Sequence, residues 1–70
     1  MDLKAATDAD PAVGLRAVRA LRDLAERLER LQVERARSLG WSWQQVADAL
    51  GVSRQAAHKK HGDVERREKG

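Results

Sequence analysis

Four side chains within residues 54–59 have the chemistry of hydrogen-bond donors that read the edge of a base pair. They are Arg54, Gln55, His58 and Lys59. An arginine guanidinium presents two donors that match the acceptors of guanine, and a glutamine amide pairs with adenine in a similar bidentate way. No acidic residue lies between Asp48 and Asp63. These residue types predict a surface that contacts bases in the major groove of duplex DNA.

A second set of side chains is suited to contacts with phosphate. It consists of Ser42, Gln44, Ser53 and Lys60. Ser42, Gln44 and Ser53 stand at the expected N-termini of helices, where backbone N–H groups without helical partners attract anions. Lys60 adds a positive charge to the same stretch. We expect this second set to position the protein on DNA and the first set to select the sequence.

Two short helices are predicted to carry these residues. Ser42 and Gln45 form a Ser-x-x-Gln capping box at the start of the first helix. Gly51 is suited to end that helix in a left-handed turn, Ser53 to cap a second helix, and Gly62 to end it. Apolar residues recur at spacings of 3 and 4 along the first helix, at Trp43, Val46, Ala47 and Leu50. The pattern predicts two amphipathic helices joined by a tight turn.

The stretch Ser42 to His61 resembles the helix-turn-helix family. It has small Ala47 where the two helices would touch, Gly51 in the turn, and Val-Ser-Arg-Gln at the start of the second helix. It is most similar to short actinobacterial proteins of the type Trp-Ser-Trp-Gln…Leu-Gly-Val-Ser-Arg-Gln-Ala…His-Lys-Lys, and less closely to the DNA-binding ends of resolvases and sigma factors. The resemblance implies that the second helix enters the major groove. It also suggests that His61 closes the end of that helix.

A long helix is predicted to precede the motif, over residues 10–40. Asp10 is a capping residue and Pro11 suits the first helical position, while Gly40 supplies the stop. Such a helix is roughly 43 Å long at 1.5 Å per residue. The sequence therefore predicts an all-α fold, with a long N-terminal dimerisation helix followed by a helix-turn-helix over residues 41–62.

The long helix carries more apolar surface than the motif is able to cover. Its leucines alternate at spacings of 3 and 4, as in a coiled coil. The candidate dimer interface consists of Val18, Leu21, Leu24, Ala25, Leu28 and Leu31. A second copy of the helix is the simplest cover, so we expect a homodimer. The residues that flank this row of leucines do not choose between a parallel and an antiparallel pair. The spacing of the motifs favours an antiparallel pair that crosses near Glu26, because its motifs would be about one turn of duplex apart.

The remaining segments are assigned to the core or to the chain ends. Trp41, Trp43 and Val52 are expected in the core, with Val52 filling the corner between the two short helices. Residues 1–9 contain one large aliphatic side chain and are predicted to form a flexible arm. Residues 63–70 carry one aliphatic side chain among balanced charges and are predicted to form a flexible charged tail.

Several functional classes are disfavoured by composition. The 70 residues include no cysteine and no tyrosine, and no phosphate-binding glycine loop or packed carboxylate–histidine pair is evident. His58 and His61 are three residues apart, but they make a poor metal site without a further fixed ligand. We therefore expect no catalysis, no metal, no cofactor and no small-molecule ligand. Neither a membrane span nor a signal peptide is evident, so a cytoplasmic, nucleoid-associated protein is expected.

The sequence thus favours a small dimeric transcriptional regulator that binds specific duplex DNA. Its net charge of +3 is modest, but the acid-free second helix concentrates positive charge on the motif. One alternative is an interaction module whose long helix docks onto a different protein. Another is an architectural protein that coats DNA with little preference for base sequence.

Overall fold

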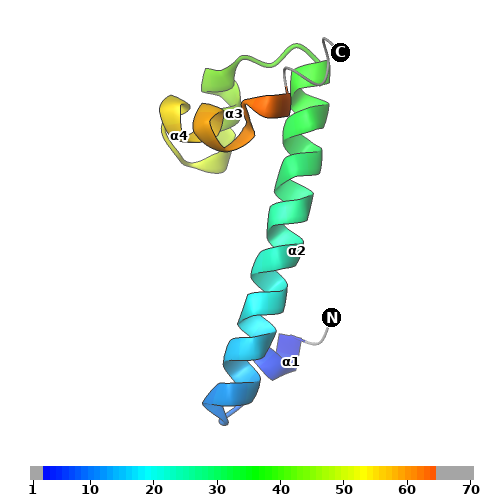
Figure 1. Cartoon of the computed structure of the whole chain (residues 1–70), viewed down its shortest axis with the longest axis vertical. Coiled ribbons are helices and arrows are strands. Elements are labelled where there is room, and N and C mark those ends of the chain that lie inside the picture. Colours follow the sequence, from blue (N-terminus) through cyan, green and yellow to red (C-terminus); the bar gives the residue numbers. More distant parts are fainter. Residues whose placement is uncertain (1–2, 65–70) are drawn as a thin grey trace.

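The computed structural model describes residues 3–64, which contain four helices and no strand. They are α1 (Leu3–Ala6), α2 (Pro11–Ser38), α3 (Trp43–Leu50) and α4 (Arg54–His61). In Figure 1, α3 and α4 lie beside the C-terminal part of α2, while its N-terminal part extends away with only α1 beside it. The predicted all-α class, with one long helix followed by shorter ones, is confirmed.

The bounds of α2 follow from local signals. The Asp10 side chain accepts a hydrogen bond from the Ala12 N–H at 2.9 Å, and Pro11 occupies the first turn. At the other end Gly40 has φ of 89°, a left-handed conformation that L side chains rarely adopt. The molecule measures 46 × 24 × 17 Å, and its radius of gyration of 15.4 Å exceeds the roughly 11 Å of a compact chain of this length. None of the helices between residues 3 and 64 is both long and apolar enough to cross a membrane.

The core lies where α3 and α4 meet each other and the C-terminal part of α2. The capping box of α3 is complete, since the Gln45 N–H donates to Ser42 Oγ and the Ser42 N–H donates to Gln45 Oε1. Gly51 ends α3 with φ of 75°, as predicted. Ala47 is 0% exposed, so a larger side chain has no space there. The buried apolar residues are Val33, Trp43, Val46, Ala47, Ala57 and Val64.

The prediction of a flexible tail from residue 63 is wrong for its first two residues. Val64 is 1% exposed and belongs to the core. The Asp63 carboxylate accepts two hydrogen bonds from the guanidinium of Arg30. Gly62 also differs from expectation, because its φ of −59° is helical rather than left-handed. Residues 65–70 lie outside the described part of the chain.

The predicted N-terminal arm is also partly ordered. Residues Leu3–Ala6 form α1, which packs against the start of α2. Gly14 is buried at this contact, where a Cβ atom would lie 3.6 Å from the Ala6 carbonyl oxygen. This distance is an ordinary van der Waals contact, so α1 covers Gly14 without requiring a glycine there. Residues 1 and 2 of the predicted arm lie outside the described residues.

Two of the three expected core residues around the motif are partly exposed instead. Trp43 is buried as predicted, but Trp41 is 39% exposed and lies at the edge of the core. Val52 does not fill the corner between α3 and α4, since it is also exposed. The Val52 N–H donates to the Ala47 carbonyl oxygen at 3.1 Å, so the turn is closed by the backbone while the Val52 side chain stays at the surface.

The predicted dimer interface divides into two parts. Val18 and Leu21 are half-buried at the end of α2 where α1 packs. Leu24, Ala25, Leu28 and Leu31 are exposed. The structure describes a single chain, so the dimer itself stays a prediction.

Candidate nucleic-acid interface

The position of α4 is fixed by a cap and by two inward side chains. Ser53 Oγ accepts a hydrogen bond from the Ala56 N–H at 3.1 Å, which starts the helix. Ala57 and His61, one turn apart, are buried towards the core. The opposite face of α4 is exposed to solvent and carries Gln55, Ala56 and Lys59. Arg54 lies on the side of Ala57 but is exposed because it is the first residue of the helix. The short helix therefore presents three hydrogen-bonding side chains to solvent.

Of the four predicted base-reading residues, His58 has the most defined surroundings. Its imidazole meets the Trp43 ring edge-on, with ring centroids 5.1 Å apart and an interplanar angle of 86°. The side chain of His58 nevertheless remains exposed. It thus stands at the border between the outward face of α4 and the core, whereas Gln55 and Lys59 extend from the outward face and Arg54 from the start of the helix.

Three of the predicted phosphate-contacting side chains lie at helix starts and already take part in local hydrogen bonds. The hydroxyl oxygens of Ser42 and Ser53 accept backbone N–H groups as helix caps. Their hydroxyl hydrogens are still able to donate to an anion. The Gln44 amide instead donates to Asp48 Oδ1 at 2.9 Å, which places a carboxylate beside it. The two serines are therefore better placed than Gln44 for phosphate contacts.

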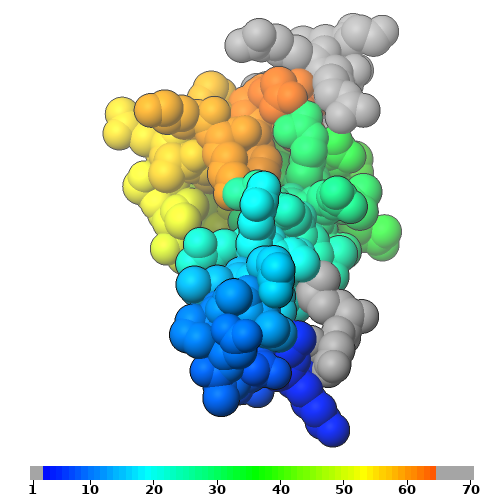
Figure 2. Space-filling view, turned by 60° about the horizontal axis from the view of Figure 1, so that its bottom comes forward, coloured from blue at the N-terminus to red at the C-terminus, as the bar shows by residue number. Residues whose placement is uncertain are grey.

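Lys60, the fourth predicted phosphate-contacting residue, lies against α2 and not on the outward face beside Lys59. Its ammonium is 3.0 Å from Glu29 Oε2 and 3.6 Å from Glu26 Oε1. These carboxylates raise the pKa of Lys60, with the hydrogen bond to Glu29 as the main cause. Figure 2 shows the C-terminal end of α4 pressed against the middle of α2. The Lys60 side chain is 50% exposed, so its contact with phosphate stays a prediction, now with two neighbouring carboxylates that compete for the ammonium.

His61 joins the same contact from a buried position. It is 3% exposed, and its Nε2 atom lies 2.6 Å from Glu29 Oε2. The hydrogen bonds from His61 and then from Lys60 lower the pKa of Glu29 below its ordinary value of 4.5. His61 is therefore buried at the end of α4, as expected, and Glu29 is its hydrogen-bonding partner. Glu29 is the carboxylate that ties the candidate reading helix to α2.

Two arginines of α2 also hold the motif in place, and sequence reasoning missed both. Arg30 binds Asp63, which follows α4. The guanidinium of Arg37 lies 4.8 Å from the Trp43 ring centroid and donates to the carbonyl oxygen of Trp41. Arg30 and Asp63 are 33 residues apart, so no local pattern predicts their contact. The contacts of Arg37 are close in sequence but depend on the turn after α2, which places Trp41 and Trp43 near the end of that helix.

The histidines of α4 do not form part of a metal cluster within residues 3–64. No group of three or more His, Cys, Asp or Glu side chains in this range is arranged to hold a metal ion. His58 contacts Trp43, while His61 contacts Glu29. The described chemistry of this face is therefore hydrogen bonding and positive charge.

Comparison of the chain with models of protein families, with curated proteins and with solved structures finds no match. The interpretation of the site therefore depends on its own residues and geometry.

Proposed function

We propose that this chain is a small dimeric regulator of transcription that binds specific sequences in duplex DNA through α4. The observation that carries the proposal is the exposed surface of α4, which presents Arg54 at the start of the helix and Gln55 and Lys59 on its outward face, without any acidic residue in the helix. Base edges in the major groove present acceptors that match these donors. The capped N-terminus of α4 adds backbone N–H groups suited to a phosphate.

The rigidity of the motif supports this assignment. Ala47 and Ala57 let the two short helices approach closely, and the buried Trp43 ring packs between Arg37 and His58. The contact of Lys60 and His61 with Glu29 fixes the far end of α4. A recognition helix held at both ends keeps its side chains in one orientation, which sequence-specific reading requires.

The proposal is tested by selecting duplexes from a random pool and then measuring affinity for the preferred site by fluorescence anisotropy. Arg54→Ala and Gln55→Ala are expected to weaken that site by about 1–3 kcal/mol each and to relax the choice of base. Asp23→Ala, on the exposed surface of α2 away from the motif, is the control and should leave the affinity unchanged. Failure to enrich any sequence would contradict specific reading, and equal competition by random duplex would favour the architectural alternative.

A different function, docking onto another protein, is favoured by one observation. The leucines of α2 between residues 24 and 31 are exposed in the single chain. A protein partner is therefore the alternative to a second copy. Measurement of the mass of the purified chain in solution separates them, because a folded monomer would leave these leucines for a different partner.

A further inference from the structure

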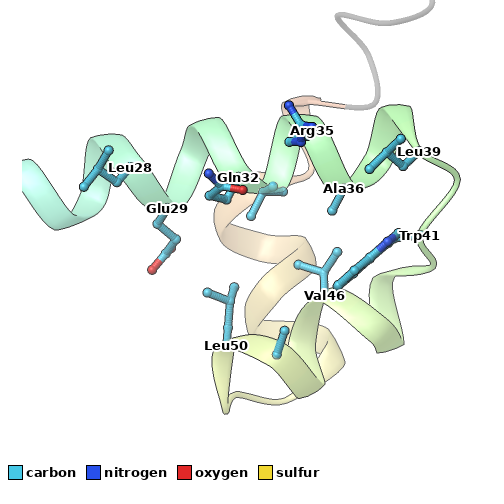
Figure 3. Close-up of a pocket in the computed structure, with 11 residues that line it drawn as sticks. Leu28, Glu29, Gln32, Arg35, Ala36, Leu39, Trp41, Val46 and Leu50 are labelled. Carbon is cyan, nitrogen blue, oxygen red and sulfur yellow. The ribbon is translucent and has the colours of Figure 1, made fainter.

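One apolar surface of the molecule is left uncovered by the described residues. Leu24, Leu28 and Leu31 are 41%, 51% and 59% exposed, and together they form what we call the leucine face of α2. Leu28 also lines a groove of about 470 Å³ between α2 and α3. Figure 3 shows that Trp41 and Leu50 reach into this groove from the α3 side. The leucine face and the groove are therefore continuous.

The length of the leucine face is limited at both ends. At the N-terminal end α1 packs over Gly14, and the neighbouring positions up to Leu21 on that side of α2 are half-buried. At the other end α2 stops at Ser38. Before the last turn of α2, the exposed positions on this side of the helix are thus Leu24, Leu28, Leu31 and Arg35, and their middle lies between Glu29 and Arg30.

Opposite charges flank the leucine face on one side. Arg27 and Glu34 are seven residues apart, so they share one side of the helix. Arg27 is exposed, and the side chain of Glu34 is 33% exposed beside Arg30, whose Nε atom is 3.6 Å away. The other flank, towards the groove, carries uncharged Ala25 and Gln32.

We propose that a second copy of this chain lies antiparallel on the leucine face, with the two-fold axis passing between Glu29 and Arg30. This inference rests on the dimer of the proposed function and adds its orientation and register. A two-fold axis perpendicular to both helices brings each flank against its own copy. Arg27 then faces Glu34 of the partner subunit, and Glu34 faces Arg27 of the partner subunit. Both pairs are attractive, and Leu28 packs against Leu31 of the partner subunit.

Other arrangements lack this complementarity. In a parallel pair opposite flanks meet, so Arg27 faces the neutral Gln32 of the partner subunit and no charge pairing results. An antiparallel crossing near Glu26 stacks more leucines but sets Arg27 against Arg27 of the partner subunit, which is repulsive. The proposed register also lays the N-terminal leucines of one copy beside the groove of the other. Each copy thereby covers the apolar surface that the other leaves exposed.

Charge exchange tests the pairing in the absence of DNA. Arg27→Glu alone and Glu34→Arg alone should each weaken dimerisation on the order of 10-fold, since two attractive pairs become repulsive. An equimolar mixture of these two variants should restore dimers, because every facing pair in the mixed dimer is again opposite in charge. Arg19→Glu, on the other face of α2, is the matched control and should dimerise as the unmodified chain does. Circular dichroism checks that each variant keeps its helices.

Cysteine pairing tests the register independently, since the chain has no cysteine of its own. The proposed register places Leu24 opposite Arg35 of the partner subunit. A mixture of Leu24→Cys and Arg35→Cys chains should therefore form a mixed disulfide, and neither variant alone should cross-link. Cross-linking of Leu24→Cys with itself would show a parallel pair and overturn the proposal.

The remaining outcomes are also decisive. Restoration of dimers in the mixture of charge variants, together with the mixed disulfide, supports the proposed pairing. Single charge variants that dimerise normally, or mixtures that fail to associate, overturn it. A monomeric unmodified chain overturns both this pairing and the dimer of the proposed function. Intact antiparallel dimers that bind no duplex would instead contradict the proposed function and leave the pairing standing.

Discussion

The helix-turn-helix region and the leucine face of α2 differ in how their apolar residues are covered. In the first region small side chains such as Ala47 and Ala57 are almost completely buried, and the helices close on each other. In the second region Leu24, Leu28 and Leu31, which are much larger, remain between two-fifths and three-fifths exposed. One region is complete within the chain, whereas the other has the surface of half an interface.

The difference shows which residues serve the fold of one chain and which serve association. Each large aliphatic side chain contributes about 1.5–3 kcal/mol on full burial, so several exposed leucines represent a large stabilisation that the single chain does not obtain. The alanines of the motif are already buried within the single chain, because small residues permit close contact between helices. Substitutions in the two regions are therefore expected to have separable effects on association and on the motif.

The largest effect is expected from Leu28→Glu. In the proposed dimer Leu28 faces the apolar Leu31 of the partner subunit, so this change buries a charge without a partner, and the dimer should dissociate and unfold at lower temperature. Light scattering at micromolar concentration should then give the mass of one 7.8 kDa chain instead of about twice that mass. Arg19→Glu should leave the mass unchanged. If Leu28→Glu has no effect on mass or melting temperature, the leucine face is not an interface between copies.

A smaller effect, confined to the motif, is expected from Ala57→Leu. Ala57 is 2% exposed between α4 and the rest of the core, and three added carbon atoms should destabilise the fold by about 1–3 kcal/mol. Its neighbour Ala56 is exposed, so Ala56→Leu is the matched control and should change stability little. Urea unfolding followed by circular dichroism measures both. Equal stabilities of the two variants would contradict the close packing of α4 described above.

Local features of the fold could be predicted from the sequence because their causes act within a few residues. The Asp10-Pro11 start, the Ser42 capping box and the left-handed Gly51 each depend on neighbours at most four positions away. The outward positions of Arg54, Gln55 and Lys59 followed from the same reasoning. The helical period sets Gln55 and Lys59 once the buried face of α4 is known, and Arg54 is exposed because it lies in the first turn.

Contacts between distant segments could not be predicted in this way. Lys60 belongs by composition to a cationic helix, but its position depends on where α4 lies against Glu26 and Glu29, more than 30 residues earlier. Val64 was assigned to a tail because charged residues surround it, although the turn after Gly62 directs it into the core. Each depends on tertiary packing, which a local pattern does not encode.

Lys59 and Lys60 sharpen the distinction between the outward and inward faces of α4. If Lys59 contacts a phosphate, Lys59→Ala should reduce the slope of log affinity against log salt by about one. Lys60→Ala should reduce the slope less, because Glu29 and Glu26 already neutralise that ammonium. Anisotropy titrations with one duplex at several salt concentrations measure both slopes. Equal reductions would show that Lys60 leaves its carboxylates when DNA binds.

The smallest effect is expected where the two regions are joined, at Glu29. Its pKa is lowered by hydrogen bonds from His61 and Lys60, so it binds a proton less readily in the folded chain than in the unfolded chain. The resulting stabilisation is therefore fully present above its ordinary pKa of 4.5 and is lost as pH falls through the lower folded value.

Glu29→Gln keeps a hydrogen-bonding side chain but removes its charge, and it should lower stability at pH 7 by about 1 kcal/mol, the net contribution of a typical intramolecular hydrogen bond. It should also make the loss of stability below pH 4.5 less steep than in the unmodified chain. Asp23→Asn is the control, because this exposed carboxylate on the same helix makes no ion pair within residues 3–64. Thermal unfolding between pH 3 and pH 7 measures the three chains. If Glu29→Gln follows the unmodified chain at every pH, this carboxylate does not hold α4 to α2, and the motif is fixed by its apolar core and by Arg30 and Arg37 alone.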